Sequence, residues 1–280
     1  MKGRKNAMSS SLVYVVTGAT DGIGWQTALE LGRRGAWVWV HGRSPAKAAA
    51  ACEKLARIVE GATFEPVAAD LAVLDEVRGL AQQVRAKTGA VDALLNNAGV
   101  FMTDRVLTAD GREMTMAVNH DAHFLLTYLL LPALKAAPQG RVVNVSSMAH
   151  AYGRIRLDDV DMAQRYDGNA AYGASKVANV LFTFALARRL RGTRVTANAL
   201  HPGVIGTKLL RTGFGAGGAP LVEGAKTSVY VATEPSLANV SGRYFSDSRE
   251  ARSAKYANDE ALQEAFFAVS EKRVGVTWSV

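Results

Sequence analysis

Short apolar runs rich in valine, leucine and aromatic residues alternate along the chain with longer stretches in which apolar residues recur at helical spacing. The short runs predict buried strands, and the longer stretches predict amphipathic helices. The predicted strands are residues 12–17, 36–41, 63–68, 91–96, 141–146, 194–200 and 242–246. The predicted helices are residues 22–34, 74–87, 111–136, 170–190 and 222–233, and one more begins at Pro45.

This alternation predicts the fold class. Strands that alternate strictly with helices run parallel, are joined by right-handed crossovers, and carry helices on both faces. No repeat or change of composition marks a second domain. We therefore expect an α/β fold, a single doubly wound Rossmann-type parallel sheet over residues 12–280, after a flexible basic N-terminus at residues 1–11. The natural start is either Met1 or Met8.

A glycine-rich turn follows the first predicted strand and reads T-G-A-T-D-G-I-G over residues 17–24. Glycines let a backbone turn tightly and approach a pyrophosphate, and the N-terminus of the following helix offers N–H groups to it. Glycines also serve plain strand–helix turns, so the motif alone is not specific. Its place between a buried strand and a helix predicts a dinucleotide site, because such sheets bind ligands beyond the carboxyl ends of their strands.

The spacing T-G-x-x-x-G-I-G resembles that of the short-chain dehydrogenase/reductase family, and further motifs follow in the order of that family. They are Asp70-Leu71, Asn96-Asn97-Ala98-Gly99, Asn119, Ser146-Ser147, Tyr172-Gly173-Ala174-Ser175-Lys176 and His201-Pro202-Gly203. The resemblance covers roughly residues 12–246. It implies a Rossmann fold and hydride transfer between a nicotinamide and a carbonyl or alcohol.

The resemblance also implies which residues bind the cofactor. Asp70 would hold the adenine amino group, residues 97–99 would pack along the adenosine ribose, and Thr207 would contact the nicotinamide carboxamide. Asp21 departs from the family pattern and adds negative charge near the phosphates. The predicted set is Gly18, Thr20, Asp21, Gly22, Ile23, Gly24, Arg43, Asp70, Leu71, Asn97, Ala98, Gly99, Tyr172, Lys176, Pro202, Gly203 and Thr207.

The end of the second predicted strand favours NADP(H) over NAD(H). An acidic residue about 20 positions after the glycine turn would bind the ribose 2′-hydroxyl. Residues 40–44 read V-H-G-R-S instead. Arg43 can pair with a 2′-phosphate through two hydrogen bonds, and Ser44 and Lys47 follow it. The alternative is that Arg43 is an ordinary solvated arginine.

Tyr172 and Lys176 supply the predicted proton-transfer chemistry. Carbonyl reduction by hydride needs a proton donor at oxygen, and alcohol oxidation needs the reverse. Lys176 lies one helical turn after Tyr172, so its charge is placed to stabilise the phenolate. Ser147 is placed to hydrogen-bond the substrate oxygen, and Ser146 is the competing choice. The resemblance adds Asn119, which would support a water chain toward the lysine, and completes the predicted catalytic set.

The segment between Ser147 and Tyr172 is long and, with residues 146–150 and 242–247, resembles the retinol-dehydrogenase-like branch. That branch implies bulky apolar alcohols and aldehydes as substrates. More broadly, we expect a small-molecule alcohol, aldehyde or ketone of apolar character. Unlike many members, this chain shows no hydrophobic N-terminal anchor. The glycine-rich residues 209–221 are either a mobile lid over the substrate or a plain surface loop.

Composition excludes several other classes. The net charge of +8 is not accompanied by a nucleic-acid-binding motif, and the arginines at 188, 189, 191 and 194 suit the solvated end of a helix. No run reaches the roughly 20 apolar residues of a membrane span. Cys52 is the single cysteine, which fits a reducing cytoplasm. His120 and His123 lack a third ligand at suitable spacing, so no metal is expected.

Two further expectations concern assembly and activity. The long helices predicted at 111–136 and 170–190 carry more apolar surface than one sheet face covers, and members of the family pair through them. We therefore expect a homodimer or homotetramer. The rival to the enzyme is a non-catalytic, cofactor-binding regulator on the same fold, against which Ser147, Tyr172 and Lys176 argue.

Overall fold

The computed structural model describes residues 11–279, and every strand in that range belongs to one sheet. The strand order is β3-β2-β1-β4-β5-β6-β7-β8. The strands are β1 (Val13–Val16), β2 (Trp37–Gly42), β3 (Thr63–Ala68), β4 (Ala93–Asn96), β5 (Gly140–Val145), β6 (Val195–His201), β7 (Tyr244–Ser246) and β8 (Arg249–Ala251). All pairs are parallel except β7–β8. The predicted α/β Rossmann-type fold is confirmed, with an antiparallel edge strand added.

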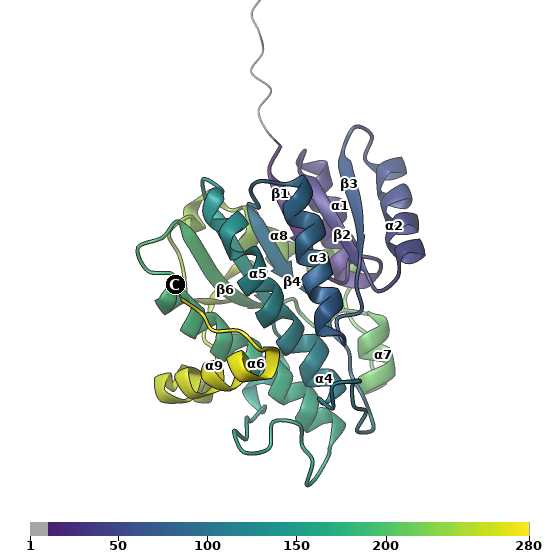
Figure 1. Cartoon of the computed structure of the whole chain (residues 1–280). Helices are drawn as coiled ribbons and strands as arrows, with labels where there is room; N and C mark the ends of the chain where they lie inside the picture. The colour runs from purple at the N-terminus through teal and green to yellow at the C-terminus, as the bar shows by residue number, and fades with distance from the viewer. Residues whose placement is uncertain (1–10, 280) are drawn as a thin grey trace, which may run out of the picture.

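Helices cover both faces of the sheet (Figure 1). One face packs against α1 (Gly22–Arg33), α2 (Pro45–Ile58) and α8 (Leu221–Thr233). The other packs against α3 (Leu74–Lys87), α5 (Ala122–Ala136) and α6 (Gly168–Arg189). Side chains alternate between the two cores: Val15 of β1 joins the second group, and Tyr14 and Val16 join the first.

The helix predicted over residues 111–136 begins later and is not uniform. It starts with α4 (Met114–Met116), passes through a π-helical turn at Ala117–Asp121, and becomes α5. The buried carboxylate of Glu113 fixes the start by accepting hydrogen bonds from the amides of Thr115 and Met116. The π-helical turn widens the helix by one residue at the position of Asn119.

Two helices and a strand were not predicted. α7 (Lys208–Phe214) lies inside the glycine-rich segment expected to be a loop or lid, and α9 (Glu260–Val274) and β8 follow the last predicted strand. Short 3₁₀ turns occur at Met148–Ala151, Pro235–Leu237 and Lys255–Asn258. The expectation for residues 1–11 falls, except for Ser11, outside the described residues.

The C-terminal helix α9 packs on the outside of α6 and α5 (Figure 1). Glu264 of α9 pairs with Arg188 and Arg189 at 2.7 and 2.6 Å, so the expectation that these arginines remain solvated is wrong. Trp278 then packs on Phe124 and Phe182. The chain itself thus covers apolar surface of α5 and α6, which was the reason for expecting an oligomer. The homo-oligomer therefore stays a prediction, and the apolar surface of these two helices no longer supports it.

Among the described residues, one helix is long and apolar enough to pass for a membrane span. It is α6, whose apolar window is 83% buried inside the fold. Its composition is that of a core helix, because it packs between the sheet and α9.

Candidate active site

A cavity of about 920 Å³ opens at the carboxyl ends of the parallel strands. Its volume lies in the upper part of the range of ligand pockets, roughly 300–1,000 Å³. The whole predicted cofactor set lines it, together with Ser147. Asn119 does not line it and lies directly behind. The structure therefore brings the predicted residues to one place, although their individual roles remain predictions.

The glycine turn packs tightly on the turn after β4. A Cβ at Gly24 would lie 2.3 Å from the Gly18 carbonyl oxygen and 2.4 Å from Asn97 Nδ2. A Cβ at Gly18, which has φ +63°, would lie 2.8 Å from Ala98 Cα. Only glycine fits at both positions, and the N-terminus of α1 can then face the cavity directly. This cradle fits the pyrophosphate of a dinucleotide.

Asp21 caps α1, because its carboxylate accepts a hydrogen bond of 2.7 Å from the Gly22 amide. On its other side it pairs with Lys208 of α7 at 3.4 Å. Lys208 was not identified from the sequence. It offsets the negative charge that Asp21 adds near the phosphate cradle.

His41 at the end of β2 is buried, and both of its ring nitrogens are bonded within the fold. Its Nδ1 accepts from the Gly18 amide at 2.9 Å, and its Nε2 lies 3.0 Å from the Ala69 carbonyl oxygen and donates to it. Burial lowers the pKa of His41, which keeps it neutral. Beyond it, Arg43 and Lys47 are exposed and line the cavity. Two cations therefore stand where the resemblance puts the adenosine ribose.

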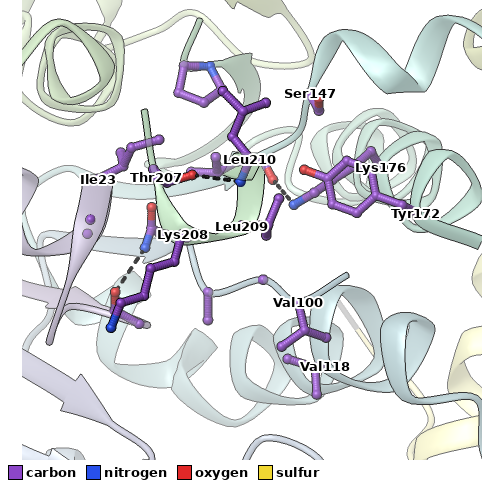
Figure 2. Close-up of a pocket in the computed structure, with 18 of the residues that line it drawn as sticks. Ile23, Val100, Val118, Ser147, Tyr172, Lys176, Thr207, Lys208, Leu209 and Leu210 are labelled. Carbon is purple, nitrogen blue, oxygen red and sulfur yellow. Dashed lines mark hydrogen bonds between the residues drawn. The ribbon is translucent and has the colours of Figure 1, made fainter. Parts of the chain in front are cut away.

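Ser147, Tyr172 and Lys176 gather at the other end of the cavity (Figure 2). The helix α6 presents Tyr172 and Lys176 one turn apart, and the ammonium lies 5.5 Å from the centre of the Tyr172 ring. Lys176 Nζ also donates to the Val145 carbonyl oxygen at 3.2 Å. Ser147 caps the following 3₁₀ turn and lies beside the Tyr172 hydroxyl.

Burial controls the protonation of this group. It raises the pKa of Tyr172 to about 12, against the opposing effect of the Ser147 hydrogen bond. It lowers the pKa of Lys176 to about 8. At neutral pH the phenol therefore keeps its proton, and most of the lysine is charged.

The two candidate serines differ in the hydrogen bonds that their hydroxyls form. Ser146 is 2% exposed, and its hydroxyl donates to the Lys176 carbonyl oxygen at 2.7 Å, so it belongs to the packing of α6. Both serines line the cavity, but the Ser146 hydroxyl is already bonded within the fold, which favours Ser147 as the substrate-facing hydroxyl.

Asn119 is fully buried in the π-helical turn. Its side-chain oxygen accepts from the Val100 amide at 2.7 Å, and its Nδ2 donates to the Val100 carbonyl and to Ser175 Oγ. A Cβ at Gly99 would lie 3.4 Å from Lys176 Nζ and 3.5 Å from Asn119 Oδ1. The lysine and the asparagine therefore converge on the same turn.

Two aromatic rings that the sequence did not single out contact the Tyr172 ring. The ring centres of Phe101 and Phe214 lie 5.7 and 5.6 Å from that of Tyr172, and 5.1 Å from each other. Phe214 comes from α7, where Gly213 packs on Phe101. These three rings, the aromatic trio, pack against one another, and two of them, Tyr172 and Phe214, line the cavity.

Comparison with known families decides the assignment. The model of the short chain dehydrogenase family matches residues 12–214. The chain belongs to this family. It is thereby an oxidoreductase that uses a nicotinamide cofactor and acts on alcohol or carbonyl groups.

Curated relatives place the chain in the retinol-dehydrogenase-like branch of the family. Human retinol dehydrogenase 14 is 40% identical, over 98% of this chain and 90% of the relative. Mouse retinol dehydrogenase 12 is 39% identical, over 98% of this chain and 89% of the relative. Human retinol dehydrogenase 13 is 42% identical over 94% and 84%.

Solved structures agree with the fold of this short-chain dehydrogenase. A crystal structure of an uncharacterised protein from Mycobacterium paratuberculosis superposes with a TM-score of 0.81, at 34% identity over 96% of this chain and 95% of the other. A structure described as an NAD(P)-dependent gluconate 5-dehydrogenase from Beutenbergia cavernae, with NADP bound at low occupancy, superposes with a TM-score of 0.69. It is 28% identical, over 84% of this chain and 94% of the other.

The histidines of α5 and its π-helical turn have separate partners in this short-chain dehydrogenase. His120 lies beside Asn179 and Ser270, and His123 lies beside Thr17 and the Asn119 carbonyl. Within residues 11–279, no three histidine, cysteine or carboxylate side chains form a group able to hold a metal ion.

Proposed function

We propose that this short-chain dehydrogenase transfers hydride between NADP(H) and a bulky apolar carbonyl or alcohol, with Tyr172 as the general acid and base. The observation that carries the proposal is the arrangement of one cavity. Arg43 and Lys47 line it where the resemblance puts the adenosine ribose, and Ser147, Tyr172 and Lys176 line it after β5 and on α6. Bound NADPH would supply the hydride.

The preference for NADP(H) rests on the charges after β2. Arg43 and Lys47 are exposed cations on the cavity wall, and His41, which occupies the last position of the strand before Gly42, is neutral. A 2′-phosphate would gain charge-assisted hydrogen bonds from Arg43, whereas no carboxylate in residues 40–44 is available for a 2′-hydroxyl. Lys208 pairs with Asp21 and so partly offsets its opposing charge. The NADP in the Beutenbergia structure is consistent with this proposal.

Tyr172 would donate its proton to the substrate oxygen during reduction. The raised pKa of Tyr172 keeps the phenol protonated at neutral pH, which is the form that reduction requires. Ser147 would hydrogen-bond the same oxygen and hold the carbonyl against the phenol. In oxidation the charge of Lys176 and of the oxidised nicotinamide would favour the phenolate.

The wall of the cavity supports an apolar substrate. Met102, Leu209, Leu210 and the ring of Phe214 line it near Tyr172, and Met148 is 58% exposed at its edge. The curated relatives are named retinol dehydrogenases. We therefore propose long or conjugated apolar aldehydes and alcohols as the substrate class.

The test is a fluorescence assay of NADPH and NADH oxidation with a graded series of aldehydes and ketones, from acetaldehyde to retinal. The proposal expects turnover with NADPH that improves with apolar size. Binding of NADPH without turnover of any compound would favour the regulator instead. The cytoplasmic location and the homo-oligomer remain proposals, and light scattering at micromolar concentration measures the second.

A further inference from the structure

A buried histidine joins the cofactor cradle to the asparagine behind Lys176. His123 Nε2 lies 3.0 Å from Thr17 Oγ1, and His123 Nδ1 lies 3.0 Å from the backbone carbonyl oxygen of Asn119. We propose that His123 is a positioning residue, which fixes the π-helical turn carrying Asn119 relative to the turn that receives the dinucleotide. Only the kinetic test of this inference rests on the proposed function.

The partners of His123 determine its tautomer. The Asn119 carbonyl can only accept, so Nδ1 carries the proton and donates to it. Burial lowers the pKa of His123 to about 3, so the ring is neutral and Nε2 is an acceptor. The Thr17 hydroxyl therefore donates to Nε2, at a shorter distance than the 3.3 Å to the Leu95 carbonyl.

Thr17 connects His123 to the cofactor cradle through its hydrogen bonds. With its proton directed at His123, its oxygen accepts from the amides of Asn97 and Ala98, at 2.9 and 3.0 Å. Asn97 Nδ2 returns a bond of 2.7 Å to the Thr17 carbonyl oxygen. The turn that the resemblance places along the adenosine ribose is thus attached to His123 through one fully buried hydroxyl.

On the other side, His123 completes the restraint of Asn119. The side chain of Asn119 is already bonded to Val100 and Ser175. The π-helical turn shifts the backbone ladder, since the Ala122 amide donates five residues back to Ala117. The His123 ring bonds the Asn119 carbonyl at this irregular point, so backbone and side chain are both fixed beside Lys176.

His123 also has no role in proton transfer. It is 1% exposed, lies outside the cavity lining, and stays neutral across the working pH range. Each ring nitrogen has one partner. The ring is therefore a fixed connector, and loss of either bond leaves a buried polar group without its partner.

The first test observes the tautomer directly. In the whole chain labelled with ¹⁵N-histidine, His123 should give the neutral spectrum with the proton on Nδ1 between pH 6 and 8. His41, which accepts at Nδ1 and donates at Nε2, should give the opposite tautomer in the same spectrum. An Nε2-protonated or charged His123 would overturn the proposal, whatever the enzyme turns over.

The second test separates positioning from general stability. His123→Leu should weaken NADPH binding, measured by fluorescence titration, by about tenfold, and lower kcat by about tenfold per folded molecule. His123→Gln, which keeps a donor and an acceptor, should recover part of both losses.

The matched control is His120→Leu, a buried histidine three residues earlier whose partners lie toward α6 and α9. It should lower the melting temperature and leave the NADPH dissociation constant unchanged. Parental binding and kcat in His123→Leu, or equal losses in both leucine variants, would refute the proposal. If the parent binds NADPH without turnover, the proposed function fails, and the titration still decides the role of His123.

Discussion

Arg273 in the C-terminal helix bonds both carboxylate oxygens of Asp121, with Nε–Oδ1 at 3.0 Å and Nη2–Oδ2 at 2.8 Å. Asp121 is fully buried and lies two residues after Asn119. Arg273 also bonds Asp161, in the long segment between Ser147 and Tyr172. Helix α9 is thereby attached to two segments that flank the site.

Replacing Arg273→Leu should therefore destabilise the fold. Asp121 would keep only Arg112, at 3.2 Å, as its charged partner. Breaking a buried ion pair from one side costs about 3–5 kcal/mol, and we expect the lower end, about 3 kcal/mol. Urea denaturation of the parent and the variant measures it. The control is Arg252→Leu, at an exposed arginine, and similar losses in both would contradict the assignment.

Asp161 should make the stability depend on acid. Burial opposes its ionisation, but hydrogen bonds from Arg273 and the Glu113 amide outweigh burial and lower the pKa of Asp161. Its folded pKa thus lies below the unfolded value of ~3.9, so the stabilisation is present above that value and is lost as pH falls through the folded pKa. Denaturation between pH 2.5 and 6 should show a weaker acid dependence for Asp161→Asn, and parallel curves would refute this.

Tyr172→Phe should abolish turnover and leave cofactor binding nearly intact, because only the phenol oxygen and its proton are removed. We expect a loss of roughly 10²–10⁴-fold in kcat, the usual contribution of a general acid or base. Stopped-flow oxidation of NADPH measures the rate, and fluorescence titration measures binding. A rate within about tenfold of the parent, under 1.4 kcal/mol of barrier, would remove Tyr172 from that role.

Lys176 should give carbonyl reduction an alkaline limb. Burial lowers the pKa of Lys176 to about 8, so the ammonium near Tyr172 is lost as pH rises through that value. The kcat/KM for reduction should fall above about pH 8, because this ratio reports the groups of the free enzyme. Lys176→Met should be slow at every pH and bind NADPH more weakly. Unchanged NADPH affinity in the variant, measured by calorimetry, would contradict a cofactor contact.

Arg43→Ala should reduce the preference for NADPH. Removing the guanidinium leaves Lys47 to pair with a 2′-phosphate on that side of the cavity. We expect kcat/KM for NADPH to fall by roughly 10–100-fold, the value of one charge-assisted pair at about 1.5–3 kcal/mol, with little change for NADH. Equal efficiency of the parent with both cofactors would sink the NADP assignment.

The parts of the site that the sequence predicted are those set by local motifs. The turn after β1, the turn after β4, and the pair Tyr172–Lys176 each lie within a few residues of a strand end. Their meeting at one edge follows from parallel topology. The strands β1 to β7 were predicted within about two residues at each end, because most of their apolar runs are continuous, whereas β8 was missed.

The parts that were missed depend on contacts between distant segments. His123 gains its role from Thr17, 106 residues away, and Arg273 gains its role from Asp121, 152 residues away. Neither separation leaves a local pattern. Helix α9 did leave one, since Leu262, Phe266 and Phe267 recur at helical spacing, but residues after 246 lie beyond the family motifs.

The aromatic trio has a consequence for the choice of substrate. A molecule that reaches the Tyr172 hydroxyl by displacing Phe214 breaks two ring contacts, with Tyr172 and with Phe101. Each such contact contributes about 0.5–1.5 kcal/mol. A long hydrocarbon chain offsets that loss by burying its own surface, whereas ethanol or acetone has too few carbons to do so. We therefore expect the three rings to favour large apolar substrates over small water-soluble ones.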